Sequence, residues 1–229
     1  MKSTKLILII LSIILISCKG KNETNPKEIK INVELKNKLE TILKKDQGIR
    51  EIVNGNLSNE RKTELLSQLN LKESDIEGNK KFELMREIDS LNLIETENII
   101  KNYGYPSKSL VGEPANKAVF YVIQHSDQID KYLPLIRKAS ENGDVSKTSL
   151  ALIEDRNLMY KGIEQIYGTQ IKGQANKKGE WIYYLWPIKS IDSINIWRKE
   201  VGFEQTLEEY LKEMDIEFNL YKINDLNDL

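Results

Sequence analysis

The sequence predicts a mainly α-helical protein, a single helical domain with one small β-hairpin near the C-terminal third. Apolar residues recur at spacings of three and four from Val33 to about Lys161, which is the period of one face of an α-helix. After Gly162 two short runs become rich in β-branched and aromatic residues, which is typical of strands. A chain of 229 residues, of which 40% are hydrophobic, is long enough to bury one ordinary core.

The first 17 residues are expected to be a signal peptide that is not part of the fold. Lys2 and Lys5 give a positive start, and residues 6–16 form an apolar run too short for a comfortable membrane span. The run ends in Leu15-Ile16-Ser17-Cys18, which resembles the bacterial lipobox, where the signal is cut before a cysteine that is then acylated. The sequence therefore predicts a lipoprotein of the bacterial cell envelope, anchored to a membrane by palmitate-type chains on Cys18, with its domain outside the cytoplasm. The plainer alternative is a buried or free thiol.

Removal of the signal peptide changes the charge and the chemistry of the chain. Cys18 is the only cysteine, so no disulfide is expected within the chain and no thiol nucleophile remains after acylation. Loss of Lys2 and Lys5 lowers the 34 basic residues to 32, against 35 acidic residues, so the formal charge becomes −3. Without a basic excess, nucleic acid is not expected as a partner. Residues 18–32 are polar and are expected to form a flexible tether.

The domain is expected to span residues 33–214 and to begin with three helices, followed at the far end by a tail over residues 215–229. The first helix has Asp46 on its apolar face and ends at Asn54-Gly55-Asn56, and Ser58 is a candidate N-cap for the second. A polar surface connection from Glu73 to Lys81 leads to the third helix, whose stripe is interpreted as core. The three faces comprise Leu35, Leu39, Ile42, Asp46, Ile49 and Val53; Leu65, Leu66 and Leu69; and Phe82, Met85, Ile88 and Leu91.

Three more helices are expected in the middle of the chain. A turn at residues 103–106 precedes Glu113-Pro114, which marks the start of a helix. A short helix, interrupted or begun near Pro134 and with Asp127 as a candidate cap, ends at residues 142–143. Ser146 caps the next helix, which runs to about Lys161. The first face comprises Ala115, Ala118, Val122, His125 and Ile129, and the last comprises Leu152, Asp155, Met159 and Gly162.

The C-terminal third is expected to contain the hairpin and two helices. Its strands are residues 163–171 and 181–186, joined by a loose loop over residues 172–179, and Pro187 stops the second strand. Asp192 is a candidate cap for a helix to Val201. Thr206-Leu207-Glu208-Glu209 is a capping box for a last helix to about Met214.

Three ionisable side chains lie on otherwise apolar helical faces. Burying a carboxylate is costly unless it is paired, so Asp46, His125 and Asp155 are expected to meet and to satisfy one another. Each also has a plainer interpretation: an ion pair at the edge of a helix, a satisfied core histidine and a surface Asp-Arg pair. The candidate ligand-binding residues beside them are Arg50, Gln124, Arg156, Tyr167 and Gln170.

Several short motifs occur in an order that resembles a bacterial family catalogued as domain of unknown function 6624. The likeness covers roughly residues 46–202, and members carry Gly-Trp-Pro at the turn and Gln-His-Ala-Asp at the histidine, so Tyr105 and Ser126 depart from the pattern. The resemblance brings no activity with it. The motifs are Asp46-Gln47 with Arg50, Tyr103-Gly104-Tyr105-Pro106, Val111-Gly112, Gln124-His125-Ser126-Asp127, Asp155-Arg156 and Tyr167-Gly168-Thr169-Gln170.

Two functional hypotheses of different classes follow. In the first, the polar side chains either stabilise the packing or bind an unidentified small-molecule or envelope ligand without turnover. In the second, His125 is the general acid or base of a hydrolase or lyase, Asp46 or Asp155 orients it, and an arginine binds an anionic substrate. Phosphate-loop, zinc-helix and nucleophile-elbow motifs are absent, and one histidine with an acylated cysteine makes a zinc site improbable, so no metal or cofactor is expected.

The lipid anchor gives a direct test. Because the acyl chains are attached through the cysteine sulfur, Cys18→Ser should leave uncut precursor and abolish partition into detergent. The measurement is a pulse-chase with detergent phase separation of the full-length protein. Normal processing of the serine variant would contradict the assignment.

Overall fold

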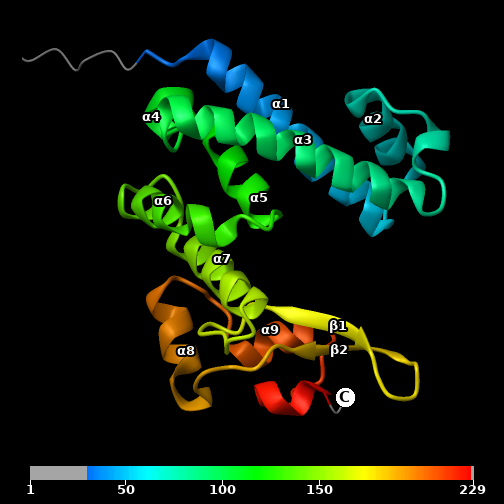
Figure 1. Ribbon diagram of the computed structural model, residues 1–229, viewed down its shortest axis with the longest axis vertical. Coiled ribbons are helices and arrows are strands. Elements are labelled where there is room, and N and C mark those ends of the chain that lie inside the picture. Colours follow the sequence, from blue (N-terminus) through cyan, green and yellow to red (C-terminus); the bar gives the residue numbers. More distant parts are fainter. Residues whose placement is uncertain (1–29, 228–229) are drawn as a thin grey trace, which may run out of the picture.

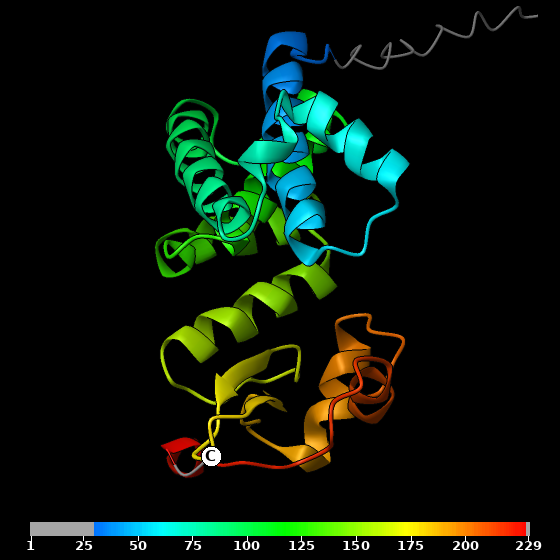
Figure 2. The ribbon, with the colours of Figure 1, turned by 90° about the vertical axis from the view of Figure 1, so that its right-hand side faces the viewer.

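The computed structural model describes residues 30–227, within which it has nine α-helices and one two-stranded sheet. The predicted fold class, mainly α with one small hairpin in the C-terminal third, is confirmed. Helices α1 to α6 form one lobe, the hairpin with α8 and α9 forms the other, and α7 lies between them (Figures 1 and 2). Cys18, the predicted signal peptide and all but the last three residues of the predicted tether lie outside the described residues. None of the helices in residues 30–227 combines the length and hydrophobicity of a bilayer span.

The first helices begin and end where local signals place them. Helix α1 (Val33–Asn54) starts where the Asn32 side chain accepts a hydrogen bond from the N–H of Leu35, and it ends at Gly55, whose φ is +79°. Helix α2 (Asn59–Leu69) has Ser58 as its N-cap, as predicted. Between it and α3 (Lys80–Tyr103), the polar connection contains a short 3₁₀ turn, η1 (Glu73–Asp75).

The interpretation of the α3 stripe as core is wrong for two of its members. Phe82 and Leu91 are 39% and 55% exposed, and α3 instead buries Asn92, Thr96 and Ile99. Helix α3 packs antiparallel to α1, and this packing selects which face of α3 turns inward (Figure 1). On α1 the same lateral packing buries Ile52 in place of the predicted Val53.

The central helix of the larger lobe is α5 (Ala118–Gln124), of which five of seven residues are buried. It follows α4 (Lys108–Val111) and the 3₁₀ turn η2 (Ala115–Lys117), and its small residues pack close to α1 and α3. The helix ends at Gln124, so His125 is its C-cap and does not lie inside a longer helix. The backbone angles of His125 remain helical, and its ring contacts Asp46 on α1 and Tyr121 one turn earlier.

Two further helices complete the larger lobe. Helix α6 (Ile129–Glu141) runs through Pro134 without interruption, and Asp127 does not cap it, because the N-cap is Gln128 and the Asp127 carboxylate accepts from the Gln128 side chain. Helix α7 (Lys147–Tyr160) has Ser146 as its N-cap, as predicted. Its buried residues are Ala151, Ile153, Asp155 and Asn157. Burial at every second position fits a helix that is covered on both sides, by α6 and by the smaller lobe (Figure 2).

The hairpin is present, but its first strand lies later than predicted. Strand β1 (Ile171–Ala175) pairs antiparallel with β2 (Trp181–Leu185), with Ile171 opposite Leu185. Residues 163–170, predicted as strand, are irregular apart from one isolated bridge between Gln165 and Ile188. Three of their backbone N–H groups, those of Ile166, Tyr167 and Thr169, donate to the Asp155 side chain of α7, so they are not free to pair with another strand.

Helices α8 (Ile191–Glu200) and α9 (Leu207–Glu213) pack with β2 around a small core of their own. The capping box at Thr206 and Glu209 is confirmed. Asp192 does not cap α8, because the N-cap is Ser190, and Asp192 lies in the first turn. The chain then returns along the hairpin as far as the 3₁₀ turn η3 (Ile223–Asn227), and the Tyr221 ring packs edge-on against Tyr184.

The close approach of Gly168 to α8 and α9 predicts a measurable cost. A Cβ at this position would lie 2.7 Å from Leu207 Cδ1, and φ is +67°, whereas Gly143 has φ +80° and open space around it. We expect Gly143→Ala to cost about 1 to 2 kcal/mol from backbone strain alone. Gly168→Ala should cost about 1 to 3 kcal/mol more, because the methyl group overpacks the small core. Urea unfolding of the two variants measures the difference, and equal losses would contradict the close packing.

Candidate functional site

The structure brings Asp46 and His125 together. His125 Nδ1 lies 3.1 Å from Asp46 Oδ1, and the side chains are 16% and 1% exposed. A carboxylate only accepts hydrogen bonds, so Nδ1 carries a proton in this pair and Nε2 is the ring nitrogen left for another partner. None of the described residues hydrogen-bonds Nε2. On its other side, the imidazole lies nearly parallel to the Tyr121 ring, with the ring centroids 6.4 Å apart.

Arg50 completes the cluster from one turn further along α1. Its Nη1 lies 3.1 Å from Asp46 Oδ1 and also donates to the Asp46 carbonyl oxygen, as the spacing of four residues predicted. Its Nη2 donates to Asp89 Oδ1 on α3 at 2.8 Å. Gln47 donates to the other Asp46 oxygen. Arg50 therefore has two carboxylate partners, and the buried charge of Asp46 is compensated.

Arg156 reaches the backbone beside His125 and has only neutral hydrogen-bond partners. Its Nη1 donates to the backbone oxygen of Gln124 at 3.1 Å, and its Nε donates to Gln170 Oε1 at 3.1 Å. Within residues 30–227 no carboxylate lies within ion-pair distance of this guanidinium. Burial lowers the pKa of Arg156, and the positive charge of Arg50 lowers it further. Arg50 therefore binds the carboxylate that pairs with His125, whereas Arg156 binds the backbone of the residue before His125 and has no anionic partner within residues 30–227.

Asp155 does not join this cluster in the structure, because other groups use both of its oxygens. Three backbone N–H groups, of Ile166, Tyr167 and Thr169, and the Thr169 hydroxyl donate to its carboxylate at 2.7–3.1 Å. Burial raises the pKa of this carboxyl, and the four donors act in the opposite direction. The side chain fixes the loop of residues 163–170 against α7. Its geometry is that of an anchor for the backbone.

The other residues predicted for the site lie either beside the Asp46–His125 pair or in the loop that Asp155 holds. Gln170 reaches the candidate site through its Oε1, and Gln124 reaches it only through its backbone oxygen. Tyr167 contributes its N–H to Asp155 and its carbonyl oxygen to Arg198, and burial raises the pKa of its hydroxyl. The structure thus places Tyr167 in the framework of the loop.

Two important residues were not singled out by the sequence. Asp89 has no pattern that links it to Arg50, which lies 39 residues earlier. Gln165 is fully buried, and its amide binds the backbone of Gln170 on one side and of Trp186 on the other. A glutamine in a short polar stretch carries no signal of this role, because its partners are backbone groups brought close by the hairpin.

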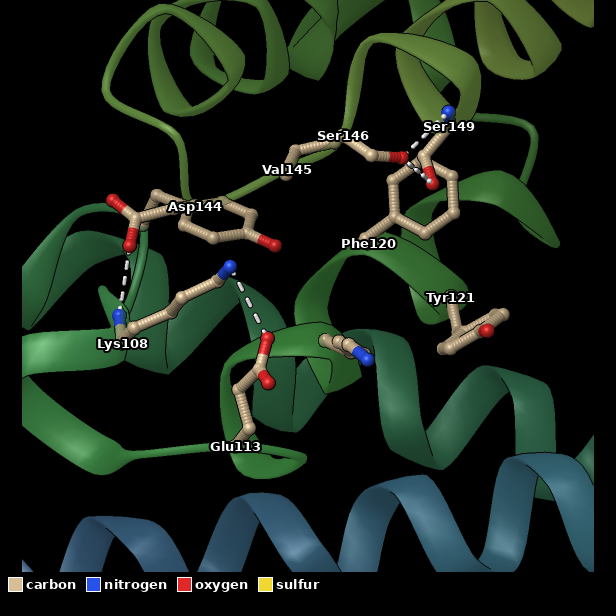
Figure 3. Close-up of a pocket in the computed structure, with 10 residues that line it drawn as sticks. Lys108, Glu113, Phe120, Tyr121, Asp144, Val145, Ser146 and Ser149 are labelled. Atoms are coloured by element: carbon tan, nitrogen blue, oxygen red, sulfur yellow. Dashed lines mark hydrogen bonds and ion pairs between the residues drawn. The ribbon is translucent and has the colours of Figure 1, made fainter. Parts of the chain in front are cut away.

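A hollow of about 230 Å³ is lined by Tyr121, whose ring also contacts the His125 imidazole (Figure 3 shows the hollow). One ion pair lies in its wall, because Lys108 Nζ pairs with Glu113 Oε1 at 3.2 Å, and the backbone N–H of Lys108 donates to Asp144. Lys117 also lines the hollow. The N-terminus of α7 at Ser146 is already capped by its own side chain. Within the described residues no group of three or more acidic, histidine or cysteine side chains is arranged to hold a metal ion.

Comparison with known proteins identifies one family. Its model, described as a family of unknown function (DUF6624), matches residues 33–223. No curated protein and no solved structure matches the chain.

The anchoring role of Asp155 can be tested by an isosteric change. Asp155→Asn replaces one acceptor oxygen by an NH₂ group that faces backbone N–H donors, so the loop loses bonds and gains a repulsive contact. We expect a loss of about 2 to 4 kcal/mol in the free energy of unfolding. Asp127→Asn, at an exposed carboxylate, is the matched control and should be neutral. Chemical denaturation compares the two, and a stable Asp155→Asn variant would contradict the anchor.

Proposed function

Since the chain belongs to the family of unknown function DUF6624, its role has to be inferred from its own site, and we propose that it is a lipid-anchored protein of the bacterial cell envelope that binds a small anionic ligand between its two lobes. The ligand lies against Arg156 and His125. The observation that carries the proposal is the Arg156 guanidinium, which is partly buried and has no anionic partner among residues 30–227.

Electrostatics favours an anion at this place. A guanidinium moved out of water is costly unless a negative charge accompanies it, and Arg50 adds to the cost by repulsion. The carboxylates of Asp46 and Asp89 are already used by Arg50 and His125. A bound phosphate or carboxylate would supply the missing charge, and the planar guanidinium matches both groups in a bidentate geometry.

The neighbouring groups suit the rest of such a ligand. His125 Nε2, when it carries no proton, accepts a hydrogen bond from a hydroxyl or amine of the ligand, since Asp46 holds the proton on Nδ1. The Gln170 amide fixes the direction of the Arg156 side chain from the smaller lobe. The ligand would therefore contact groups held by α5, α7 and the loop before β1.

The envelope part of the proposal rests on the sequence. Cys18 at the end of the lipobox-like run supports acylation, and the membrane is then the partner of the mature protein. Palmitate-type chains would hold the protein, and its domain would lie outside the cytoplasm.

A second candidate function is acid-base catalysis by the same site, as in a hydrolase or lyase with an anionic substrate. The Asp46–His125 pair favours it, because a carboxylate on Nδ1 orients the imidazole and stabilises the imidazolium that forms when Nε2 takes a proton. Catalysis also requires a reacting group within reach of Nε2.

Anion binding gives the main test. Inorganic phosphate, sulfate and citrate should raise the melting temperature of the wild-type protein, with at least one giving a saturable shift. Arg156→Gln should abolish this shift, because the unpaired charge is lost. Arg137→Gln, which removes an exposed arginine of α6, should retain it. A shift that persists in Arg156→Gln would contradict the site.

The two candidate functions differ in the behaviour of His125. With chromogenic phosphate and carboxylate esters, an enzyme should show turnover that His125→Gln lowers by about a hundredfold or more, whereas anion binding weakens only modestly. Turnover unchanged by His125→Gln would exclude the acid-base role. Equal loss of thermal stability and of anion binding, with no turnover in the wild-type protein, would indicate that the pair is structural.

A further inference from the structure

The surface between α1 and α3 carries a groove unrelated to the candidate site. Two hollows of about 420 Å³ and 170 Å³ lie along this helix pair and share Lys38 at their junction. We call them together the α1–α3 groove, and the residues that matter here are Asn32, Lys38, Lys45, Leu91, Ile94 and Tyr103.

The α3 side of the groove exposes three large side chains, between the polar residues Asn92, Glu95, Asn98 and Asn102. Leu91, Ile94 and Tyr103 are 55%, 54% and 50% exposed, so about half of each side chain faces solvent beside a hollow. The structure places no described residue over them. Apolar side chains gathered at a surface hollow mark a place where a protein meets a partner or a membrane.

The α1 side of the groove carries one lysine without a carboxylate partner. Glu34 and Lys38 line it as well, and Lys38 pairs with Glu95 across the groove, whereas Lys45 has no carboxylate partner among the described residues. Lys44, the next residue on α1, lines a different hollow on the side of α2. In the larger hollow an unpaired lysine therefore stands beside exposed leucine and isoleucine, a combination that suits contact with anionic lipid.

The groove also lies where the chain enters the domain. Asn32 lines it, and the Asn32 N–H is fixed by the carbonyl oxygen of Leu110 at 2.8 Å. From Cys18 to Asn32 the chain cannot span more than about 50 Å even when fully extended. The hairpin lies at the opposite end of the long axis of the molecule (Figure 1). An anchor at Cys18 therefore leaves the α1–α3 end of the molecule within reach of the membrane.

We propose that the α1–α3 groove docks on the bilayer that holds the acyl chains of Cys18, with Leu91 and Ile94 in the headgroup region and Lys45 against anionic lipid. The proposal rests on the lipid anchor proposed above. It gives the protein a fixed orientation, with the smaller lobe directed away from the membrane.

Fluorescence labelling of the lipidated protein tests the contact. Acylation consumes the only native thiol, so a cysteine introduced by Ile94→Cys is the single site for an environment-sensitive dye. In vesicles of phosphatidylglycerol and phosphatidylcholine, the dye should shift to the blue and be protected from a soluble quencher. The same dye on Lys178→Cys, an exposed position in the hairpin loop, should show neither change.

The adjacent Lys44 and Lys45 allow the contribution of charge to membrane docking to be tested with two matched variants. Lys45→Glu should reverse most of the blue shift at position 94, whereas Lys44→Glu makes the same charge change outside the groove and should leave it intact. Equal effects of the two variants, or none, would overturn the assignment of Lys45.

Flotation with the vesicles separates failure of the anchor from failure of the docking. Protein that floats without a blue shift at position 94 is anchored but not docked, which overturns the inference alone. Protein that does not float lacks the anchor, which overturns the proposed localisation and the docking with it. A blue shift without vesicles that grows with protein concentration would show that a second copy covers the groove, and it would also overturn the inference.

Discussion

The connection between the two lobes depends on the buried carboxylate of Asp155. A charged group in this position is unfavourable unless donors surround it, and the loop of residues 163–170 provides four of them. The requirement acts in both directions. The carboxylate needs the loop to satisfy its charge, and the loop needs the carboxylate to satisfy backbone N–H groups that have no strand partner. The hydrogen bonds between Asp155 and the loop fix where β1 begins. They thereby fix the position of the hairpin relative to α7.

The candidate site depends on that arrangement. Gln170 follows directly after the loop, and its Oε1 orients Arg156, which stands one residue after Asp155 on α7. A helix directs consecutive side chains about 100° apart, so Asp155 can hold the smaller lobe while Arg156 reaches back to the end of α5. The backbone oxygen of Gln124 then brings Arg156 next to His125. Asp155 thus stabilises the loop of the smaller lobe, whereas the adjacent Arg156 belongs to the candidate site.

Helix α1 links the site to the face that we propose for the membrane. Asp46 and Lys45 are neighbours in the sequence but face different surroundings, since Asp46 is buried against His125 and Lys45 lines the α1–α3 groove. A protein docked through this groove would hold His125 and Arg156 behind α1, at the junction with the smaller lobe. An anionic ligand would then approach from the aqueous side, where the charge of the lipid surface repels it less.

The sequence by itself determined the elements whose causes are local. The caps at Ser58, Ser146 and Thr206, the break at Gly55 and the pair of Asp46 with Arg50 involve groups at most four residues apart, so their geometry follows from helix dimensions. The exposed Phe82 and Leu91, the second partner of Arg50 at Asp89 and the separation of Asp155 from His125 were decided only by the tertiary structure. In each case, either the interacting residue lies far along the chain, or no neighbouring element covers the exposed side chain. Periodicity shows that a face exists, but only packing shows what meets it.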